Sequence, residues 1–366
     1  MSKDLALALS GGGVRAMAFH LGVLRLLAEN GALERVKELS TVSGGSLLTG
    51  LIFSKNGMRW PTSTEFLTKT HGEIRSILLN TDIQAGAIGR LLFRPTLWRY
   101  FTSRPNIVAL TIYEDWRIRG KLQDLPRSPR WAINCTTAET GRRFRFKGGR
   151  LGDYETGYAD CSRFPLASAM AVSAAFPVGL GPFRLQTSRL KWAKALGWNS
   201  GDERAIELPY RSLHLYDGGV YDNLGLESLF DAGKLQPKAG VTPHIIVSDA
   251  GAPLSRGFGL NALNPFRMKR LMDVMMDQNR ALRVRGFVSY VTKTKQGAYI
   301  GIQRTANVRS FLQNPCPSGT WLTEEEATYA TTYSTSLHAL SESDFNIIEA
   351  HGYQTAHLTE MGFPFL

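Results

Sequence analysis

The chain has 366 residues, 43% hydrophobic and 20% charged, so it is long enough for a full globular core and lacks the composition of a disordered protein. It has no apolar run of about eighteen residues and no good signal peptide, so we expect no transmembrane helix. Three cysteines without metal-site spacing favour free thiols and a cytoplasmic protein. We expect no cofactor. The formal net charge of +12 favours an anionic partner. Because no nucleic-acid-binding motif is visible, we expect that partner to be an anionic membrane surface and not a nucleic acid.

The first part of the chain predicts a parallel α/β unit. Residues 5–10 form a short apolar run that ends at a glycine, as a buried strand does. Residues 15–29 are apolar on most sides and predict a helix. Residues 38–42 predict a second short strand, and residues 44–54 a second helix that begins on two glycines. A strand, a glycine loop, a helix, a strand, a sharp turn and a helix follow one another, which is typical of α/β proteins.

Residues 58–128 have little strand character and predict a helical insertion. Within them, residues 83–101 combine leucines and aromatic residues with arginines. One interpretation is a helical cover whose arginines face solvent. The other is a lid or membrane-contacting surface, because basic amphipathic segments with tryptophan settle at lipid interfaces.

The middle of the chain returns to strand patterns. Residues 130–137 and 142–147 predict a hairpin, and the alanine- and serine-rich residues 163–175 predict a tightly packed helix. Residues 181–211 are loop-rich. Residues 213–216 predict a short strand that ends at an Asp-Gly-Gly sequence.

The last part of the chain predicts further elements of the same kinds. Residues 224–230 begin a helix, and residues 244–248 form a buried strand. Residues 266–286 predict a basic helix, residues 287–304 the last sheet strands, and residues 323–361 the C-terminal helices.

No internal repeat or low-complexity linker divides the chain. We therefore expect a single domain over residues 1–366, with its core over about residues 5–300. The helical insertion over about 58–128 and the C-terminal helices over about 323–361 would belong to this domain.

A serine lies at the turn between the second predicted strand and helix. The sequence from Thr41 to Gly45 nearly matches the nucleophile-elbow pattern G-x-S-x-G, with Ser43 at its centre. Such a turn needs small residues two positions before and after the serine. Gly45 meets this demand, whereas Thr41 is small but branched. A serine before two glycines is more often a helix N-cap, so the motif needs further support.

The glycine loop after the first strand offers backbone N–H groups that no side chain obstructs. Glycines at a helix start can direct two adjacent N–H groups toward a developing negative charge, as an oxyanion hole requires. Dinucleotide-binding loops have a similar composition. The oxyanion interpretation involves Gly11, Gly12, Gly13, Val14 and Arg15. Arg15 would either hold the loop in place or lie close to the oxyanion.

Asp217 is the strongest candidate for a partner of Ser43. It ends a short apolar strand, as Ser43 nearly does, so we expect both side chains at the same carboxyl edge of a parallel sheet. Asp249 ends another strand and competes with Asp217, but lacks two following glycines. His20 lies inside the first predicted helix, His214 should point to the sheet face opposite Asp217, and the other five histidines have no motif around them. A Ser/Asp dyad is therefore more economical than a triad. An aspartate is a weak base at its ordinary pKa and would need a water-poor pocket.

Three ordered motifs resemble those of the patatin-like phospholipases. They are the glycine loop before Arg15, the Ser43 turn, and the sequence from Asp217 to Gly225, preceded by Phe176-Pro177. The resemblance covers about residues 5–300. The sequence departs from the family pattern at Thr41 and Ala16, where glycines are usual.

The resemblance implies a three-layer α/β/α fold with a mostly parallel central sheet and a helical insertion. It also implies metal-independent hydrolysis of phospholipid or other acyl-lipid esters by a Ser43–Asp217 dyad, peripheral to a membrane. The residues implied in support of the elbow and the dyad are Gly44, Gly45, Gly218 and Gly219.

Two other functions stay open on the sequence alone. A dinucleotide-binding module would need an acidic residue at the end of the second strand, where residues 41–43 stand instead. A catalytically weak membrane-surface signalling protein could share the fold. A regulated bacterial membrane-degrading effector, switched on by a ligand or a protein, and a housekeeping lipase would carry the same motifs.

Overall fold

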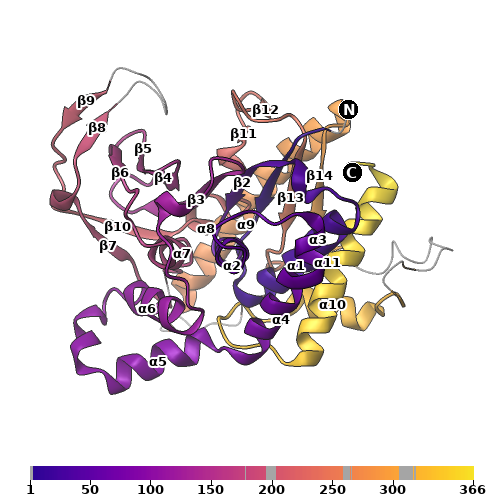
Figure 1. Ribbon diagram of the computed structural model, residues 1–366, viewed down its shortest axis with the longest axis horizontal. Coiled ribbons are helices and arrows are strands. Elements are labelled where there is room, and N and C mark those ends of the chain that lie inside the picture. The colour runs from indigo at the N-terminus through magenta and orange to yellow at the C-terminus, as the bar shows by residue number, and fades with distance from the viewer. Residues whose placement is uncertain are drawn as a thin grey trace.

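The computed structural model describes residues 3–177, 179–194, 203–258, 264, 266–304, 316 and 319–366. Within these residues a large mixed sheet occupies the centre of the molecule, with helices on both of its faces (Figure 1). The strands of this sheet are β1 (Leu5–Leu9), β2 (Val36–Thr41), β3 (Arg130–Thr137), β4 (Arg143–Lys147), β5 (Arg150–Asp153), β6 (Gly157–Asp160), β7 (Phe183–Gln186), β8 (Trp192–Lys194), β9 (Arg204–Ile206), β10 (Ser212–Asp217), β13 (Ile245–Asp249) and β14 (Gly297–Gly301). Two further strands, β11 (Phe230–Asp231) and β12 (Gln236–Pro237), pair separately.

The helices fall into a core group and an inserted group. The core group comprises α1 (Gly13–Glu29), α2 (Gly44–Lys55), α7 (Leu166–Ser173), α8 (Gly219–Asp222), α9 (Phe266–Thr294), α10 (Glu324–Thr332) and α11 (Glu342–Gly362). Between β2 and β3 lie α3 (Ser63–Glu65), η2 (Phe66–Thr70), α4 (His71–Asn80), α5 (Ile83–Phe93), η3 (Pro95–Tyr100), α6 (Pro105–Asp115) and η4 (Leu122–Asp124). Short helical turns also occur at η1 (Leu33–Arg35), η5 (Thr187–Arg189) and η6 (Leu226–Ser228). Among the described residues, no helix is both long and apolar enough to cross a bilayer.

The sheet has a parallel part and an antiparallel part. The strand order is β14-β13-β1-β2-β3-β4-β5-β6-β8-β9, and neighbouring strands are parallel from β14 to β3 and antiparallel from β3 to β9. The parallel strands read as continuous apolar runs because both of their faces are covered. In β1, Leu5 and Leu7 face the core beneath α1 and α2, whereas Ala6 and Ala8 face the cluster that includes Phe287 of α9.

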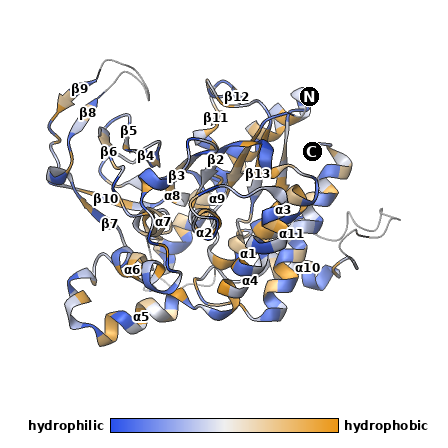
Figure 2. Ribbon diagram, viewed as in Figure 1, coloured by the Kyte–Doolittle hydropathy of each residue, from blue (hydrophilic) through white to orange (hydrophobic). Residues whose placement is uncertain are grey.

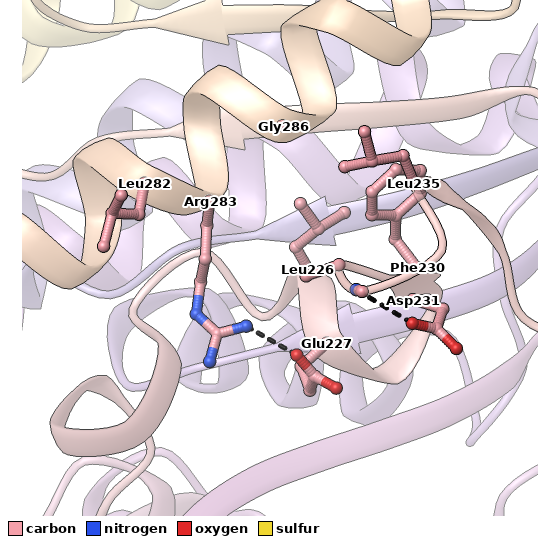
Figure 3. A pocket seen from close by; sticks show the side chains of 10 residues that line it. Leu226, Glu227, Phe230, Asp231, Leu235, Leu282, Arg283 and Gly286 are labelled. Atoms are coloured by element: carbon pink, nitrogen blue, oxygen red, sulfur yellow. Dashed lines mark hydrogen bonds and ion pairs between the residues drawn. The ribbon is translucent and has the colours of Figure 1, made fainter.

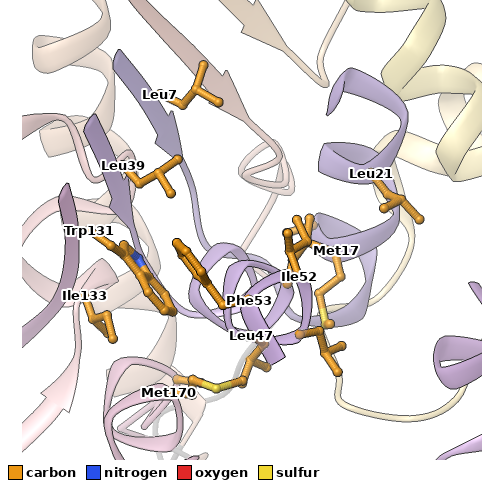
Figure 4. Close-up of a cluster of buried hydrophobic side chains, with 14 of the residues drawn as sticks. Leu7, Met17, Leu21, Leu39, Leu47, Ile52, Phe53, Trp131, Ile133 and Met170 are labelled. Atoms are coloured by element: carbon orange, nitrogen blue, oxygen red, sulfur yellow. The ribbon is translucent and has the colours of Figure 1, made fainter. Parts of the chain in front are cut away.

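The core between the sheet and α2 is formed by side chains from elements far apart in the sequence (Figure 4). Phe53 of α2 stacks on Trp131 of β3, with ring centroids 5.3 Å apart. Met170 of α7 lies where a side chain at Gly50 would otherwise stand. The sheet and the helices α1, α2 and α7 therefore share one continuous core, which fixes the turn between β2 and α2.

Three expectations for the second half of the chain were wrong. Residues 287–294 continue α9 and are not a strand, because Phe287, Tyr290 and Val291 recur at helical spacing and pack together. The loop-rich residues 181–211 contain three short strands, β7, β8 and β9. The helix expected over residues 224–230 is reduced to the three-residue turn η6 before β11.

Candidate active site

Ser43 lies at a sharp turn between β2 and α2. Its backbone has φ 49° and ψ −119°, a conformation that costs a non-glycine residue free energy and is typical of strained functional turns. Its backbone N–H donates to the Ser173 carbonyl and to the Ser173 hydroxyl, at 3.2 and 3.1 Å. A Cβ atom at Gly45 would stand 2.4 Å from the Leu9 carbonyl oxygen, so this turn requires glycine two positions after the serine. The geometry is that of a nucleophile elbow.

Thr41 fits the turn because its branched side chain points into the core. Its hydroxyl lies 2.7 Å from the Ser46 hydroxyl and accepts a hydrogen bond from the Trp131 indole at 2.8 Å. The Ser46 hydroxyl in turn lies 2.8 Å from the Ser173 hydroxyl, which donates to the Asn134 carbonyl at 2.7 Å. A glycine at position 41 would remove the first member of this chain of hydrogen bonds.

Asp217 reaches Ser43 by a route that differs from our expectation. We expected both residues at the carboxyl ends of parallel strands, but β10 runs antiparallel to β3. Both β2 and β10 pair with the edge of β3 opposite β4, β2 reaching Ile133 and β10 reaching Cys135. The two strands therefore meet end to end, about 7 Å apart along β3. Their carboxyl ends face each other, and this junction brings Asp217 to Ser43.

The Asp217 carboxylate is buried at this junction and is 4% exposed. Burial raises its pKa to about 7, although hydrogen bonds with the Gly219 N–H and the Ser43 hydroxyl oppose the rise. The Gly219 N–H donates to Oδ1 at 2.7 Å. A Cβ atom at Gly218 would lie 2.6 Å from the Asn134 carbonyl oxygen, so the backbone there passes directly over β3. A carboxylate that titrates near neutrality and contacts a serine hydroxyl can act as a general base.

The glycine loop before α1 uses some of its N–H groups within the fold. The Gly11 N–H donates to the Asn223 carbonyl at 3.1 Å, and the Val14 N–H donates to the Ser336 carbonyl at 2.9 Å. Among the described residues, the N–H groups of Gly12 and Gly13 have no acceptor. A Cβ atom at Gly11 would lie 3.0 Å from the Ser43 Cβ, which places the loop against the elbow.

Arg15 lies behind this loop and not in solvent. Its side chain is buried, and its guanidinium donates to the Tyr333 carbonyl and, at 3.1 Å, to the Ala250 carbonyl. Burial lowers the pKa of Arg15 to about 10, against the attraction of the Asp249 carboxylate, so the group stays charged at neutral pH. A Cβ atom at Gly12 would lie 3.1 Å from this guanidinium, and the same distance from the Ala16 methyl group. Arg15 thus holds the loop from beneath.

Asp249, the competing carboxylate, is engaged elsewhere. It is fully buried and accepts hydrogen bonds from Arg280 at 2.7 Å and from the Tyr299 hydroxyl at 2.6 Å. Burial acts to lower the pKa of Arg280, but the Asp249 carboxylate outweighs it and holds that pKa above its ordinary value. Asp249 therefore joins α9 to the end of β13 and does not contact Ser43.

The histidines also have partners away from Ser43. His20 is buried, and its Nε2–H donates to the Ser10 carbonyl, so Nδ1 accepts from the Ser248 hydroxyl at 2.7 Å. Burial lowers its pKa to about 4, so it is neutral in the core. His214 pairs with Glu139 at 2.6 Å on the sheet face opposite Asp217. The remaining five contact other groups: His71 with Glu349, His244 with Phe365, His338 with Asp82, His351 with Ile302 and His357 with Trp321.

Two residues of this site have no counterpart in our sequence-based interpretation. Ser173, the last residue of α7, binds the Ser43 backbone and links it to Ser46. Asn223 accepts from Gly11, and its Oδ1 lies 2.8 Å from where a Cβ at Gly219 would stand. Asn223 could have been noticed, since it lies within the motif from Asp217 to Gly225. Nothing in the alanine- and serine-rich pattern distinguishes Ser173 from its neighbours.

A pocket of about 450 Å³ lies away from this site, between α9 and the β11–β12 hairpin (Figure 3). Leu226 and Phe230 line its apolar part, and Arg283 binds Glu227 at its polar side. Neither Ser43 nor Asp217 lines it.

Comparisons with known proteins give the family and the fold of this chain. The family model of patatin-like phospholipases matches residues 7–230, which is more than half of the chain. Human GIVD cytosolic phospholipase A2 has a similar fold, with a TM-score of 0.59 and 14% identity over 98% of this chain and 59% of that one. The same human enzyme in complex with methyl gamma-linolenyl fluorophosphonate gives a TM-score of 0.52 and 15% identity over 98% of this chain and 57% of that one.

The chain thus spans less than two thirds of the length of these human enzymes. No curated protein matches it. The fold, which has helices on both faces of the central sheet, is the one expected from the motifs. By its family match, the chain belongs to the patatin-like phospholipases.

Proposed function

We propose that the protein is a serine lipid acyl hydrolase that cleaves carboxylic ester bonds of phospholipids or other acyl lipids. The observation that carries the proposal is the junction of the strained Ser43 elbow with the turn after the buried Asp217. The N–H groups of Ser43 and Gly218 donate to the same Ser173 carbonyl, at 3.2 and 3.4 Å. Family membership supports a lipid substrate. The complex of the human neighbour with a fluorophosphonate supports the same class of chemistry.

In the proposed first step, Asp217 accepts the proton of the Ser43 hydroxyl while Oγ bonds to the ester carbonyl carbon. The carbonyl oxygen becomes an oxyanion. The N–H groups of Gly12 and Gly13, which have no acceptor among the described residues, would stabilise it. Gly11 and Val14 hold the loop through their own hydrogen bonds, and Arg15 supports it from beneath.

The tetrahedral intermediate then breaks its bond to the alcohol, which leaves with the proton held by Asp217. The acyl group stays on Ser43 as an ester. In the second half of the reaction, Asp217 accepts a proton from a water molecule that attacks this ester. The fatty acid leaves, and the proton returns to the Ser43 oxygen.

The alternative of a dinucleotide-binding module is less well supported. It would need a carboxylate at the end of β2 to bind a ribose. Thr41 stands there, and its hydroxyl is already engaged with Ser46 and Trp131.

The proposal predicts that Ser43→Ala and Asp217→Asn each lower fatty-acid release by at least about a thousandfold, because each removes a group that takes part in bond making. Release is measured by mass spectrometry after incubation with a total lipid extract, which also identifies the headgroup and the acyl position. Ser54→Ala on α2 and Asp231→Asn are matched controls and should retain activity.

Full activity of either site variant would overturn the dyad. If the wild-type protein neither releases fatty acid nor reacts with a fluorophosphonate probe, a membrane-surface signalling protein on the same fold becomes the better interpretation.

We also propose that the protein works at the cytoplasmic side of a membrane. The buried free thiols of Cys135 and Cys161 suit a reducing compartment.

A further inference from the structure

Large apolar side chains that remain exposed are concentrated in two segments of the chain. Among the described residues, eleven such side chains are at least 50% exposed, and eight of them lie in these segments. The first segment, residues 83–101, contributes Ile88, Leu92, Phe93, Trp98 and Phe101. The second, residues 266–279 of α9, contributes Met268, Leu271 and Met275. Figure 2 shows hydrophobic residues along α5, at the lower edge of the molecule. Concentrated exposed apolar surface marks a binding face.

The first segment begins beside the glycine loop. The N–H of Gln84, in the first turn of α5, donates to the Leu337 carbonyl at 3.2 Å. The preceding carbonyl, that of Ser336, accepts from Val14 at 2.9 Å. The start of α5 is thus only one residue of connecting chain away from the loop to which we assign the oxyanion hole.

The same segment ends beside Asp217. Just after Phe101, the Ser103 hydroxyl donates to the Pro182 carbonyl at 2.9 Å, and Arg104 donates to the Gly179 carbonyl at 3.0 Å. These carbonyls follow closely on Ala175, which accepts from the Asp217 N–H at 2.9 Å. Residues 83–101 therefore run from one side of the candidate site to the other.

The second segment projects beyond the same edge of the sheet. Arg280 of α9 binds Asp249, the last residue of β13. The helix then continues toward Gly297, which pairs with Ile245 at the opposite end of β13. Residues 266–279 consequently extend about 20 Å past the carboxyl edge. Met268, Leu271 and Met275 recur at intervals of three and four residues, so they share one face of the helix.

Cations accompany both segments. Arg99 lies over the Tyr100 ring, with its guanidinium carbon 4.8 Å from the ring centroid, and Arg267 lies over the Phe258 ring at 5.5 Å. Arg270 donates to the Ser255 hydroxyl. In the part of the chain that the structure describes, these three arginines form no ion pair with a carboxylate. Their charges would repel a second copy of the same face and attract an anionic surface.

We infer that residues 83–101 and 266–279 form a docking face that places the carboxyl edge of the sheet, and Ser43 with it, against an anionic phospholipid bilayer. The role of this face in bringing Ser43 to lipid rests on the proposed function, whereas the position of its exposed side chains does not. Phe93 and Trp98 of the first segment, and Leu271 and Met275 of the second, are the exposed side chains that would enter the interface. The arginines lie at the level of the lipid phosphates.

The experiment compares two double variants, Phe93→Ser/Trp98→Ser and Leu271→Ser/Met275→Ser, with the wild-type protein. The control is Phe363→Ser, because Phe363 is also exposed but follows α11 near His244, at the amino edge of the sheet. Binding is measured by co-sedimentation with vesicles of equal parts phosphatidylcholine and phosphatidylglycerol. Hydrolysis of a soluble short-chain ester, thermal unfolding and oligomeric state are measured in parallel.

We expect each double variant to lower the partition coefficient by at least about tenfold, because side chains that would be buried in the bilayer are lost. Ester hydrolysis and unfolding should stay within about twofold and a few degrees of the wild type. Wild-type vesicle binding in both double variants would overturn the inference. So would a change of oligomeric state with unchanged vesicle binding, which would assign the face to a second copy. If the wild-type protein hydrolyses no ester, the proposed function fails, but the vesicle comparison still decides the docking face.

Discussion

Ser43 and Asp217 differ in how the fold prepares each for the proposed chemistry. Ser43 is held in a backbone conformation with φ 49°, where three hydrogen bonds fix it: two to Ser173 through its N–H, and one from Leu47 to its carbonyl. This conformation holds the half-buried Ser43 at the start of α2. Asp217 is prepared by burial, which removes water from its carboxylate and makes it a stronger base than an ordinary aspartate.

The raised pKa of Asp217 predicts a specific pH dependence. Only the deprotonated carboxylate can accept the Ser43 proton, and burial raises its pKa to about 7. We therefore expect kcat/KM for a soluble ester to rise about tenfold per pH unit below about pH 7 and to level off above it. An initial-rate profile from about pH 5 to pH 9, corrected with Ser43→Ala, measures this. A flat profile, or one that falls across neutrality, would contradict a base of this kind.

At the scale of single elements, α9 is attached to the candidate site by its middle residues. Arg280 binds Asp249, while Asn279 donates to the Tyr221 carbonyl at 3.0 Å and Arg283 binds Glu227. Tyr221 belongs to α8, directly after the Asp217-Gly-Gly turn. The helix that carries half of the proposed docking face is thus anchored to the segment that carries the proposed base.

The Asp249–Arg280 pair predicts a large effect of a single substitution on stability. Arg280→Ala would leave the fully buried Asp249 carboxylate without its cation, which typically costs about 3–5 kcal/mol. Equilibrium unfolding in urea at neutral pH measures this loss. The double variant Asp249→Asn/Arg280→Met removes both charges and should recover most of it. If Arg280→Ala is as stable as the wild type, the ion pair does not hold α9 to the sheet.

The sequence was sufficient for elements whose pattern is local. Strands β1 and β13 are buried on both faces, and the bounds of each were predicted to within one residue. Residues 287–294 were misassigned because aromatic and β-branched residues favour strands, whereas their helical spacing determines the packing. The direction of β10 could not be read from its own residues. It depends on how the strands between β3 and β10 return the chain to the edge of β3.

The same distinction holds for the candidate site. The motifs were sufficient to select Ser43 and Asp217, and the structure brings both to the junction of β2 and β10, but their catalytic roles stay predictions. Ser173 and Asn223 were missed because their importance arises only from contacts made across the fold. From the sequence alone, Arg15 could either hold the glycine loop or lie near the oxyanion. Its burial against two distant carbonyls could not be foreseen.

For the molecule as a whole, the formal net charge of +12 predicts that salt weakens membrane binding. Counterions screen attraction between an exposed cation and a lipid phosphate over about 8 Å at physiological ionic strength. We expect the partition onto anionic vesicles to fall about tenfold between about 50 and about 500 mM NaCl. Neutral phosphatidylcholine vesicles provide the control and should bind weakly at both concentrations. If the partition onto anionic vesicles is the same at both salt concentrations, electrostatic attraction does not contribute to binding.

That residues 1–366 form one domain stays a prediction.

The end-to-end junction of β2 and β10 also bears on protein synthesis. A nascent chain that has emerged only as far as β9 contains the serine of the elbow but not the aspartate that would activate it. The loop of Gly12 and Gly13 is completed later still, because its supports at Tyr333 and Ser336 are translated after β14. Truncated translation products would therefore lack the complete site. If the protein is the lipid hydrolase that we propose, this order of assembly would leave partial chains inactive toward membrane lipids.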